Sequence, residues 1–388
     1  MRPRLNARYL LRVTICLLAF ISVGCSRSFS LPDHGKFGEV GDMNAKRSGH
    51  TATLLHDGTV LITGGRDGTS PLQSAEIFDP AKLEFIPTGS MTASRVKHSA
   101  TLLPNGQVLI AGGFDNSGNA VATAERYNPN SKMFSTVGNM NTTRACQAAV
   151  LLPNGKVFLV GGGSETSSAE LFDPASETFT QTDPMVAPRE NCTATLLPNG
   201  KVLVTGRGRI SDATYNRRSN AIAELYDPDT NTFSPAGMMI VDRQWHTATL
   251  LNDGRVMIVG GSGYKYQSGN EDSVAAESTA EFYDPSSGTF TRANDGLRAG
   301  EILHNAILLS NGSVFILGSD GFTDPGQIFD PGANQYTSIE IGNSPVDDVE
   351  YEFNMQDRSA TVLNDKTILI TGGDNELSYS KAAVIYNP

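Results

Sequence analysis

The sequence has few of the residues that cross-link chains or attract polyanions. It contains four cysteines and one Trp in 388 residues. Lys and Arg number 30 against 41 Asp and Glu, which gives a net charge of −11, and the body of the chain has no basic run. An acidic surface of this kind disfavours nucleic acids and anionic membrane surfaces as partners. Zinc motifs, phosphate-binding loops and nucleophile elbows are missing too.

The first 24 residues have the pattern of an export signal. Four arginines precede an apolar run at 13–23, which is short for a membrane span. The run ends in Ser22-Val23-Gly24-Cys25, which resembles a bacterial lipobox. We therefore predict a signal peptide at 1–24, a lipidated Cys25, and a tether at 25–34 that supplies the only membrane contact. The alternative is ordinary signal-peptidase cleavage, which would release the protein into the periplasm or the extracellular medium.

The rest of the chain repeats one pattern seven times. Each copy has an apolar strand, a tight turn, a strand that usually ends in glycine, and an Ala-Glu-like strand whose aromatic precedes Asp-Pro or Asn-Pro. Proline cannot donate to a sheet ladder, so each of these pairs ends a strand. The aromatics are Phe78, Tyr127, Phe172, Tyr226, Tyr283, Phe329 and Tyr386.

The turns of the first six copies are Asn-Gly or Asp-Gly, as in Asp57-Gly58 and Asn105-Gly106. This pair predicts a hairpin because both residues tolerate the positive φ of a two-residue turn. The seventh copy has the weaker Asn364-Asp365-Lys366.

A repeat of this length is one four-stranded sheet, and several copies must stack to bury a core. The chain stops after the third strand of copy seven, while Phe37-x-x-x-Gly41-x-Met43 matches the fourth strand of other copies. We therefore predict an all-β protein: one seven-bladed β-propeller of four-stranded antiparallel blades at 35–388. Its last blade is closed by the N-terminal strand, which removes an open edge.

Together, the glycine pair, the aromatic before Asp-Pro and the last-strand aromatic resemble the kelch repeat. They are more similar still to the bacterial kelch proteins related to the central domain of galactose oxidase. The resemblance covers residues 35–388, although the last strand carries Phe or Tyr where kelch repeats usually have Trp. It implies a propeller that serves in binding, scaffolding or catalysis.

Several polar residues recur at fixed places before the first strand. We expect the arginines to form structural ion pairs with glutamates of the third strands rather than to bind an anion; both sets occur in copies one to five. The arginines are Arg47, Arg95, Arg144, Arg189 and Arg243, and the glutamates are Glu76, Glu125, Glu170, Glu224 and Glu281.

Four histidines follow at a second repeated place, with Gln147 and Cys192 in copies three and four. Residues that share a place in different blades usually pack, so we expect neither a metal nor a cofactor. The histidines are His50, His98, His246 and His304.

Two long loops, at 206–221 and 261–277, join the second and third strands of copies four and five. In a blade these loops share one face with the connections between blades, and we call it the long-loop face. Variable loops on a rigid scaffold commonly carry function, and Arg, Tyr and Trp suit a sugar or a peptide. The alternative is solvated loops with the Trp packed between blades. The candidate ligand-binding residues are Arg207, Arg209, Tyr215, Arg217, Arg218, Trp245, Tyr264 and Tyr266.

The two cysteines of the body, Cys146 and Cys192, lie in adjacent copies, and a disulfide between them is possible in an exported protein. They are offset by one residue in register, so the alternative is two small buried side chains. Neither cysteine is placed to form the Cys-linked Tyr that the galactose oxidase resemblance would require.

The leading hypothesis is a monomeric, non-catalytic binding module for a protein or a carbohydrate, exported to the outer membrane or cell surface. The alternatives are a carbohydrate-active enzyme, similar to galactose oxidase or to a sialic-acid mutarotase, and a structural envelope lipoprotein.

Overall fold

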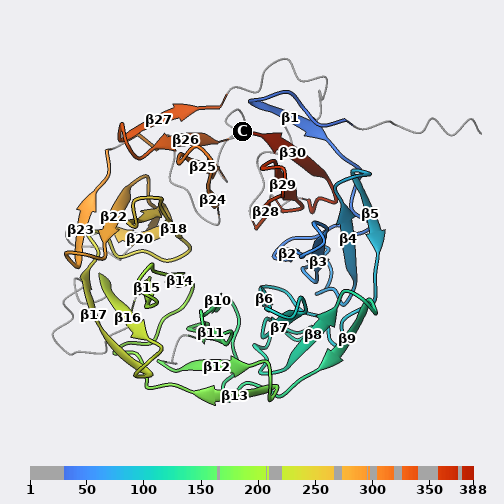
Figure 1. The fold of residues 1–388 in the computed structure, drawn as a ribbon, viewed down its shortest axis with the longest axis horizontal. Helices are drawn as coiled ribbons and strands as arrows, with labels where there is room; N and C mark the ends of the chain where they lie inside the picture. The colour runs from blue at the N-terminus through green and yellow to red at the C-terminus, as the bar shows by residue number, and fades with distance from the viewer. Residues whose placement is uncertain are drawn as a thin grey trace, which may run out of the picture.

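The protein is a closed ring of seven antiparallel four-stranded sheets (Figure 1), as the repeats predicted. The computed structural model describes residues 30–163, 167–206, 208, 221–265, 273–294, 296–297, 304–318, 326–339, 357–374 and 378–388. None of these residues lies in a helix that is long and apolar enough to span a membrane.

Each of the first three blades runs outward in chain order from the centre of the ring. Blade 1 contains β2 (Thr51–Leu54), β3 (Val60–Thr63), β4 (Ala75–Asp79) and β5 (Glu84–Pro87). Blade 2 contains β6 (Ser99–Leu102), β7 (Val108–Ala111), β8 (Ala124–Asn128) and β9 (Met133–Thr136). Blade 3 contains β10 (Ala148–Leu151), β11 (Val157–Val160), β12 (Ala169–Asp173) and β13 (Thr178–Gln181).

The next three blades keep this order, and blade 5 carries an extra hairpin. Blade 4 contains β14 (Thr193–Leu196), β15 (Val202–Thr205), β16 (Ile222–Asp227) and β17 (Thr232–Met238). Blade 5 contains β18 (Thr247–Leu250), β19 (Val256–Val259), β22 (Ala280–Asp284) and β23 (Thr289–Arg292), with the hairpin β20 (Ser262–Lys265) and β21 (Ser273–Ala276). Blade 6 contains β24 (Asn305–Leu308), β25 (Val314–Leu317), β26 (Gln327–Asp330) and β27 (Gln335–Ser338).

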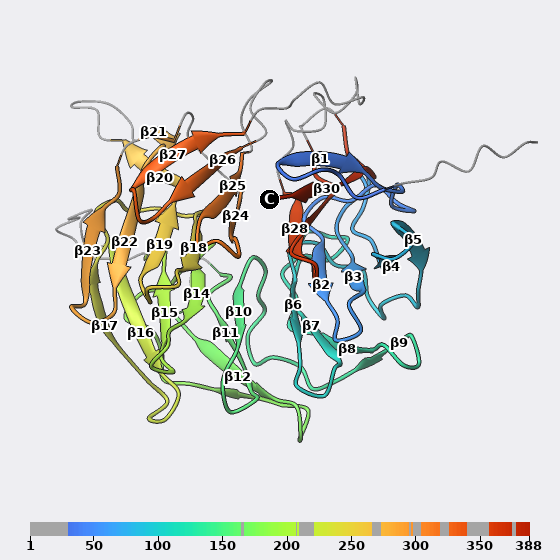
Figure 2. The ribbon, with the colours of Figure 1, turned by 45° about the horizontal axis from the view of Figure 1, so that its top comes forward.

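Blade 7 joins the two ends of the chain. It contains β28 (Ser359–Val362), β29 (Ile368–Thr371), β30 (Ala383–Asn387) and, as its outer strand, β1 (Lys36–Glu39). Phe37 pairs with Tyr386 in the ladder, and their rings lie 4.7 Å apart between centroids. The predicted closure by the N-terminal strand is therefore confirmed (Figures 1 and 2).

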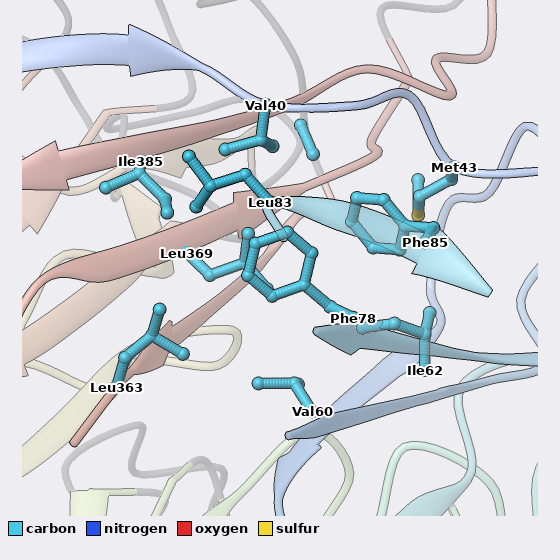
Figure 3. Close-up of a cluster of buried hydrophobic side chains, with 11 residues drawn as sticks. Val40, Met43, Val60, Ile62, Phe78, Leu83, Phe85, Leu363, Leu369 and Ile385 are labelled. Carbon is cyan, nitrogen blue, oxygen red and sulfur yellow. The ribbon is translucent and has the colours of Figure 1, made fainter. Parts of the chain in front are cut away.

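The core lies between blades. Along β3, Val60 and Ile62 pack towards blade 7, whereas Leu61 packs towards blade 2. Because alternate side chains of a strand point to opposite faces, a strand between two neighbours must be apolar at every position. Figure 3 shows the contact between blades 7 and 1, where Val40 and Met43, just after β1, join this cluster.

The hairpin turns differ from the predicted two-residue type. Only the glycine takes positive φ, as in Gly58 at +87°, and the N–H of Gly58 donates to the carbonyl of Leu55 at 3.1 Å. Asp57 Oδ1 instead accepts from the backbone N–H of Thr59 at 3.0 Å. The loop therefore has three residues, with a left-handed glycine after a tight turn. In copy seven Lys366 takes this conformation, with φ of 75°.

Candidate functional site at the channel mouth

Buried ion pairs set the frame of the site. Arg47 Nε lies 2.8 Å from Glu76 Oε1, and the guanidinium also donates to the carbonyls of Gly64 and Ser74, at 2.7 and 3.0 Å. Arg47 thus links the approach to β2 with the end of β3 and the start of β4. The same pairing occurs in all five copies that carry both residues, so the structural interpretation of these arginines is confirmed; the other pairs are Arg95–Glu125, Arg144–Glu170, Arg189–Glu224 and Arg243–Glu281.

Three residues after the arginine, one side chain per blade connects to the preceding blade; we call this the slot position. His98 Nε2 lies 3.1 Å from Thr51 Oγ1 and 3.0 Å from Thr63 Oγ1 of blade 1. Gln147 Nε2 donates to Ser99 Oγ of blade 2 at 3.1 Å. The slot residues therefore join neighbouring blades, as the packing interpretation predicted. The described slot residues are His50, His98, Gln147, Cys192, His246, His304 and Arg358.

Three of the slot histidines, His50, His98 and His246, are neutral at ordinary pH. Burial, with the nearby Arg47, lowers the pKa of His50 to about 3. Burial also lowers the pKa of His98 to about 3, with Arg95 as the next cause, and that of His246 to about 3, with Arg243 as the next cause. These rings act as uncharged hydrogen-bonding spacers around the channel.

In each copy, the residue just before the slot residue lies at the opening of the channel in the centre of the ring. We call this place the mouth position. Its backbone is left-handed in every described copy, with φ between 48° and 62°. Backbone hydrogen bonds link neighbouring copies: the N–H of Lys97 donates to the carbonyl of Gly49 at 2.8 Å, and that of Cys146 to the carbonyl of Lys97 at 2.9 Å. The mouth residues are Gly49, Lys97, Cys146, Asn191, Trp245 and Asp357.

Two cavities meet at these mouth residues. An outer one of about 710 Å³ opens on the long-loop face and is also lined by Arg66, Phe114 and Tyr379. An inner one of about 290 Å³ continues towards the slot residues. The outer volume is within the range of small-molecule sites, and its mixture of aromatic and charged groups suits a polar ligand with an apolar face.

An ion pair crosses the opening above blade 1. Lys97 Nζ of blade 2 lies 2.9 Å from Asp357 Oδ2 of blade 7, and the two side chains are 29% and 18% exposed. Blade 1 has glycine between them, at Gly49. A Cβ there would lie 2.9 Å from Val96 Cγ2 and 3.2 Å from Lys97 Cγ, so the missing side chain leaves the room in which the pair forms.

At neutral pH the Lys97 side chain at the mouth is charged and the Cys146 thiol is uncharged. Burial lowers the pKa of Lys97, but the pairing with Asp357 outweighs it and the pKa is raised overall. Burial raises the pKa of the Cys146 thiol to about 11, with Lys97 opposing this. The thiol is therefore protonated and a weak nucleophile.

Among the predicted ligand residues, only Trp245 has a described side chain, and it lines both cavities. Tyr264 lies on β20, whose backbone alone is described there. The others, and the lipidation candidate Cys25, lie outside the described residues; those others are Arg207, Arg209, Tyr215, Arg217, Arg218 and Tyr266.

The possible disulfide is not formed: Cys146 and Cys192 are free thiols. The reason is the one-residue offset in register. Cys146 takes the mouth position of blade 3, whereas Cys192 takes the slot position of blade 4, where its Sγ lies 3.7 Å from the carbonyl oxygen of Val160.

Sequence reasoning missed five of the six described mouth residues, because it looked for residue types that recur. The available signal was a position whose residue type changes from copy to copy. Between the repeated Arg and the slot residue, the mouth position holds a different residue type in each described copy. A framework that repeats around a position that does not repeat is the pattern expected of a recognition surface.

The kelch motif model matches residues 47–92 and 95–141, which correspond to the first two blades. Together with the ring of seven sheets, this shows a β-propeller with kelch motifs. No curated protein matches the propeller's sequence significantly.

Among solved structures, the propeller is similar to a fungal alcohol oxidase of the AA5 family in complex with copper. The identity is 18%, the TM-score is 0.66, and the match covers 91% of this chain and 76% of the oxidase chain. At this identity the likeness concerns the fold, which is of the galactose oxidase type.

Among the described residues, no group of three or more His, Cys, Asp or Glu side chains is placed to hold a metal ion. The slot histidines His50, His98 and His246 direct Nε2 to threonine hydroxyls of the preceding blade. Their role in joining blades accounts for these rings without a metal.

Proposed function

We propose that this kelch propeller is an exported, lipid-anchored binding module that captures a protein or carbohydrate ligand at the channel mouth of its long-loop face. The observation that carries the proposal is the contrast between the Arg–Glu frame, repeated in five blades, and the mouth positions, which all differ in residue type. Kelch propellers commonly act as interaction modules, and this fold fits that class.

Rigidity supports a role in binding. The mouth residues are tied to one another by backbone hydrogen bonds and rest on slot residues that join neighbouring blades. A preformed site of this kind loses little conformational entropy when a ligand binds. Non-glycine residues with left-handed backbone are costly and concentrate at functional sites, and Lys97, Cys146 and Trp245 are three of them.

The test uses a substitution that the propeller itself provides. Trp245→Asn places at the mouth of blade 5 the residue that blade 4 has at its own mouth position, Asn191. Asn tolerates the left-handed backbone, so the ring is removed without a new strain. Met133→Ala, on the outer strand β9 and 66% exposed, is the control.

We expect wild type and Met133→Ala to give the same hits on a glycan array and in pull-downs from envelope extracts, and Trp245→Asn to lose them with an unchanged melting temperature. Hits that survive Trp245→Asn would move the site elsewhere. Turnover of a bound sugar would favour the carbohydrate-active alternative, and the absence of any hit would favour a structural envelope role.

The anchor is tested separately. We expect the wild-type protein to incorporate a fatty-acid label in a bacterial host and to fractionate with membranes, and Cys25→Ser to lose both properties. A wild-type protein without label would overturn the lipoprotein part and leave the binding proposal standing.

A further inference from the structure

The ion pair over Gly49 restricts which charges a ligand can bring to the mouth. Lys97 and Asp357 already satisfy each other at 2.9 Å, and both are largely withdrawn from water. A ligand carboxylate that binds Lys97 must displace Asp357 and leave a half-buried carboxylate unpaired. An ammonium group that binds Asp357 would strand Lys97 in the same way. Leaving a half-buried charge uncompensated is unfavourable.

An uncharged ligand meets no such obstacle. An ammonium group has three N–H donors and a carboxylate has two oxygens, so Lys97 and Asp357 each keep hydrogen-bonding capacity beyond their shared contact. Two neighbouring hydroxyls can use it together, because one accepts from Lys97 while the other donates to Asp357. Hydrogen bonds to charged groups are the stronger kind.

Trp245 supplies the second element. It lines the same two cavities as Lys97 and Asp357 and lies in blade 5, away from the three blades that hold the pair. An indole face packs on the C–H face of a sugar ring, and the outer cavity of about 710 Å³ has room for one or two such rings.

We infer that the mouth binds a neutral pyranose, stacked on Trp245, whose adjacent hydroxyls bridge Lys97 and Asp357 while their ion pair stays intact. This inference rests on the proposed binding function and adds the class of ligand, its charge and the two residues that select it. The pair itself disfavours acidic sugars and amino sugars.

The experiment measures binding of methyl pyranosides by titration calorimetry. The probes are methyl glycosides of glucose, galactose and mannose, of the corresponding uronic acids, and of glucosamine. We expect the wild type to bind at least one neutral glycoside about ten-fold more tightly than the matching uronate, since a hydrogen bond to a charged group is worth about that factor.

Asp357→Asn is the decisive variant, because it keeps size and hydrogen bonding while releasing the charge of Lys97. We expect it to bind the uronate about ten-fold more tightly than the wild type does, with the neutral glycoside weakened. Lys97→Asn, which again fits a left-handed backbone, should shift preference towards the amino sugar. Thermal melting of each variant checks that the ring is intact.

Three results would overturn the inference. The first is wild-type protein that prefers the uronate or the amino sugar. The second is a sugar that binds with a preference that Asp357→Asn leaves unchanged, because the ion pair would then not be the selector. The third is a failure of all the glycosides to bind at millimolar concentration; if pull-downs then still depend on Trp245, the binding function stands and the ligand is a protein.

Discussion

Arg47 and Glu76 meet at 2.8 Å with 1% of either side chain exposed, and Glu76 also accepts from the backbone N–H of Asn44 at 2.7 Å. One carboxylate therefore fixes both the arginine and the segment that enters the blade. Blade 7 does without it, since Val384 occupies the place of Glu76 and Met355 that of Arg47 in the sequence. The sequence thus contains both combinations of residues at these two positions.

This contrast yields the first prediction. Glu76→Val alone leaves Arg47 buried without its counter-ion and should lower the free energy of unfolding by about 3–5 kcal/mol. The double variant Arg47→Met with Glu76→Val copies blade 7 and should recover part of that loss. Urea denaturation of the two single variants and the double variant gives the coupling free energy between Arg47 and Glu76. A double variant that is less stable than both single variants would show that the pair is not the unit of stability.

The second prediction concerns closure of the ring. A chain that begins at residue 44 lacks β1, Val40 and Met43, so the edge of β30 and the cluster between blades 7 and 1 become exposed. We expect it to aggregate or to melt far below a chain that begins at residue 30. Size-exclusion chromatography and thermal melting compare the two. Equal melting temperatures would mean that β1 is dispensable.

The third prediction uses the turn of copy seven, where Lys366 is exposed and has a φ of 75°. A left-handed backbone costs a side-chain-bearing residue about 1 kcal/mol that glycine avoids. Lys366→Gly should therefore stabilise the protein by about 1 kcal/mol. The reciprocal control is Gly200→Lys, at a φ of +83° with nothing within 4 Å of an added Cβ, which should destabilise it by a similar amount.

The fourth prediction is a pH dependence. The pKa of His50, His98 and His246 is about 3 in the folded protein, against the ordinary histidine value of 6.5 that applies to the unfolded chain. Below pH 6.5 the unfolded chain takes up protons that the folded protein does not, so stability is full above that pH and falls as the pH drops towards about 3. Each ring contributes about 1.4 kcal/mol per pH unit over this window.

His98→Gln copies the slot of blade 3, which holds Gln147, and removes one titrating ring. Between about pH 6 and pH 4, within the window above, its free energy of unfolding should fall less steeply than that of the wild type. The difference in slope should equal the contribution of one histidine. Chemical denaturation at several pH values gives both slopes. Identical slopes would mean that His98 takes up its proton in the folded protein as well.

Much of the architecture was predictable from local patterns. The aromatic before Asp-Pro and the glycine turns mark strand ends, and the match of Phe37 to the last strands placed β1 beside Tyr386, as found. The co-occurrence of Arg and Glu in copies one to five predicted their pairing. The predicted turn type was wrong, because the side chain of Asp57 accepts a hydrogen bond within the loop and its backbone is not left-handed.

The sequence by itself determined the number of blades and the strand that closes the ring, because a motif that repeats about every fifty residues can be counted and the residues around Phe37 match the last strand of other copies. The channel mouth was decided only by the tertiary structure. Lys97 and Asp357 come from copies two and seven and meet only because the ring closes and Gly49 leaves the space between them. No local pattern marks such a contact, since its partners share neither a residue type nor a neighbourhood in the chain.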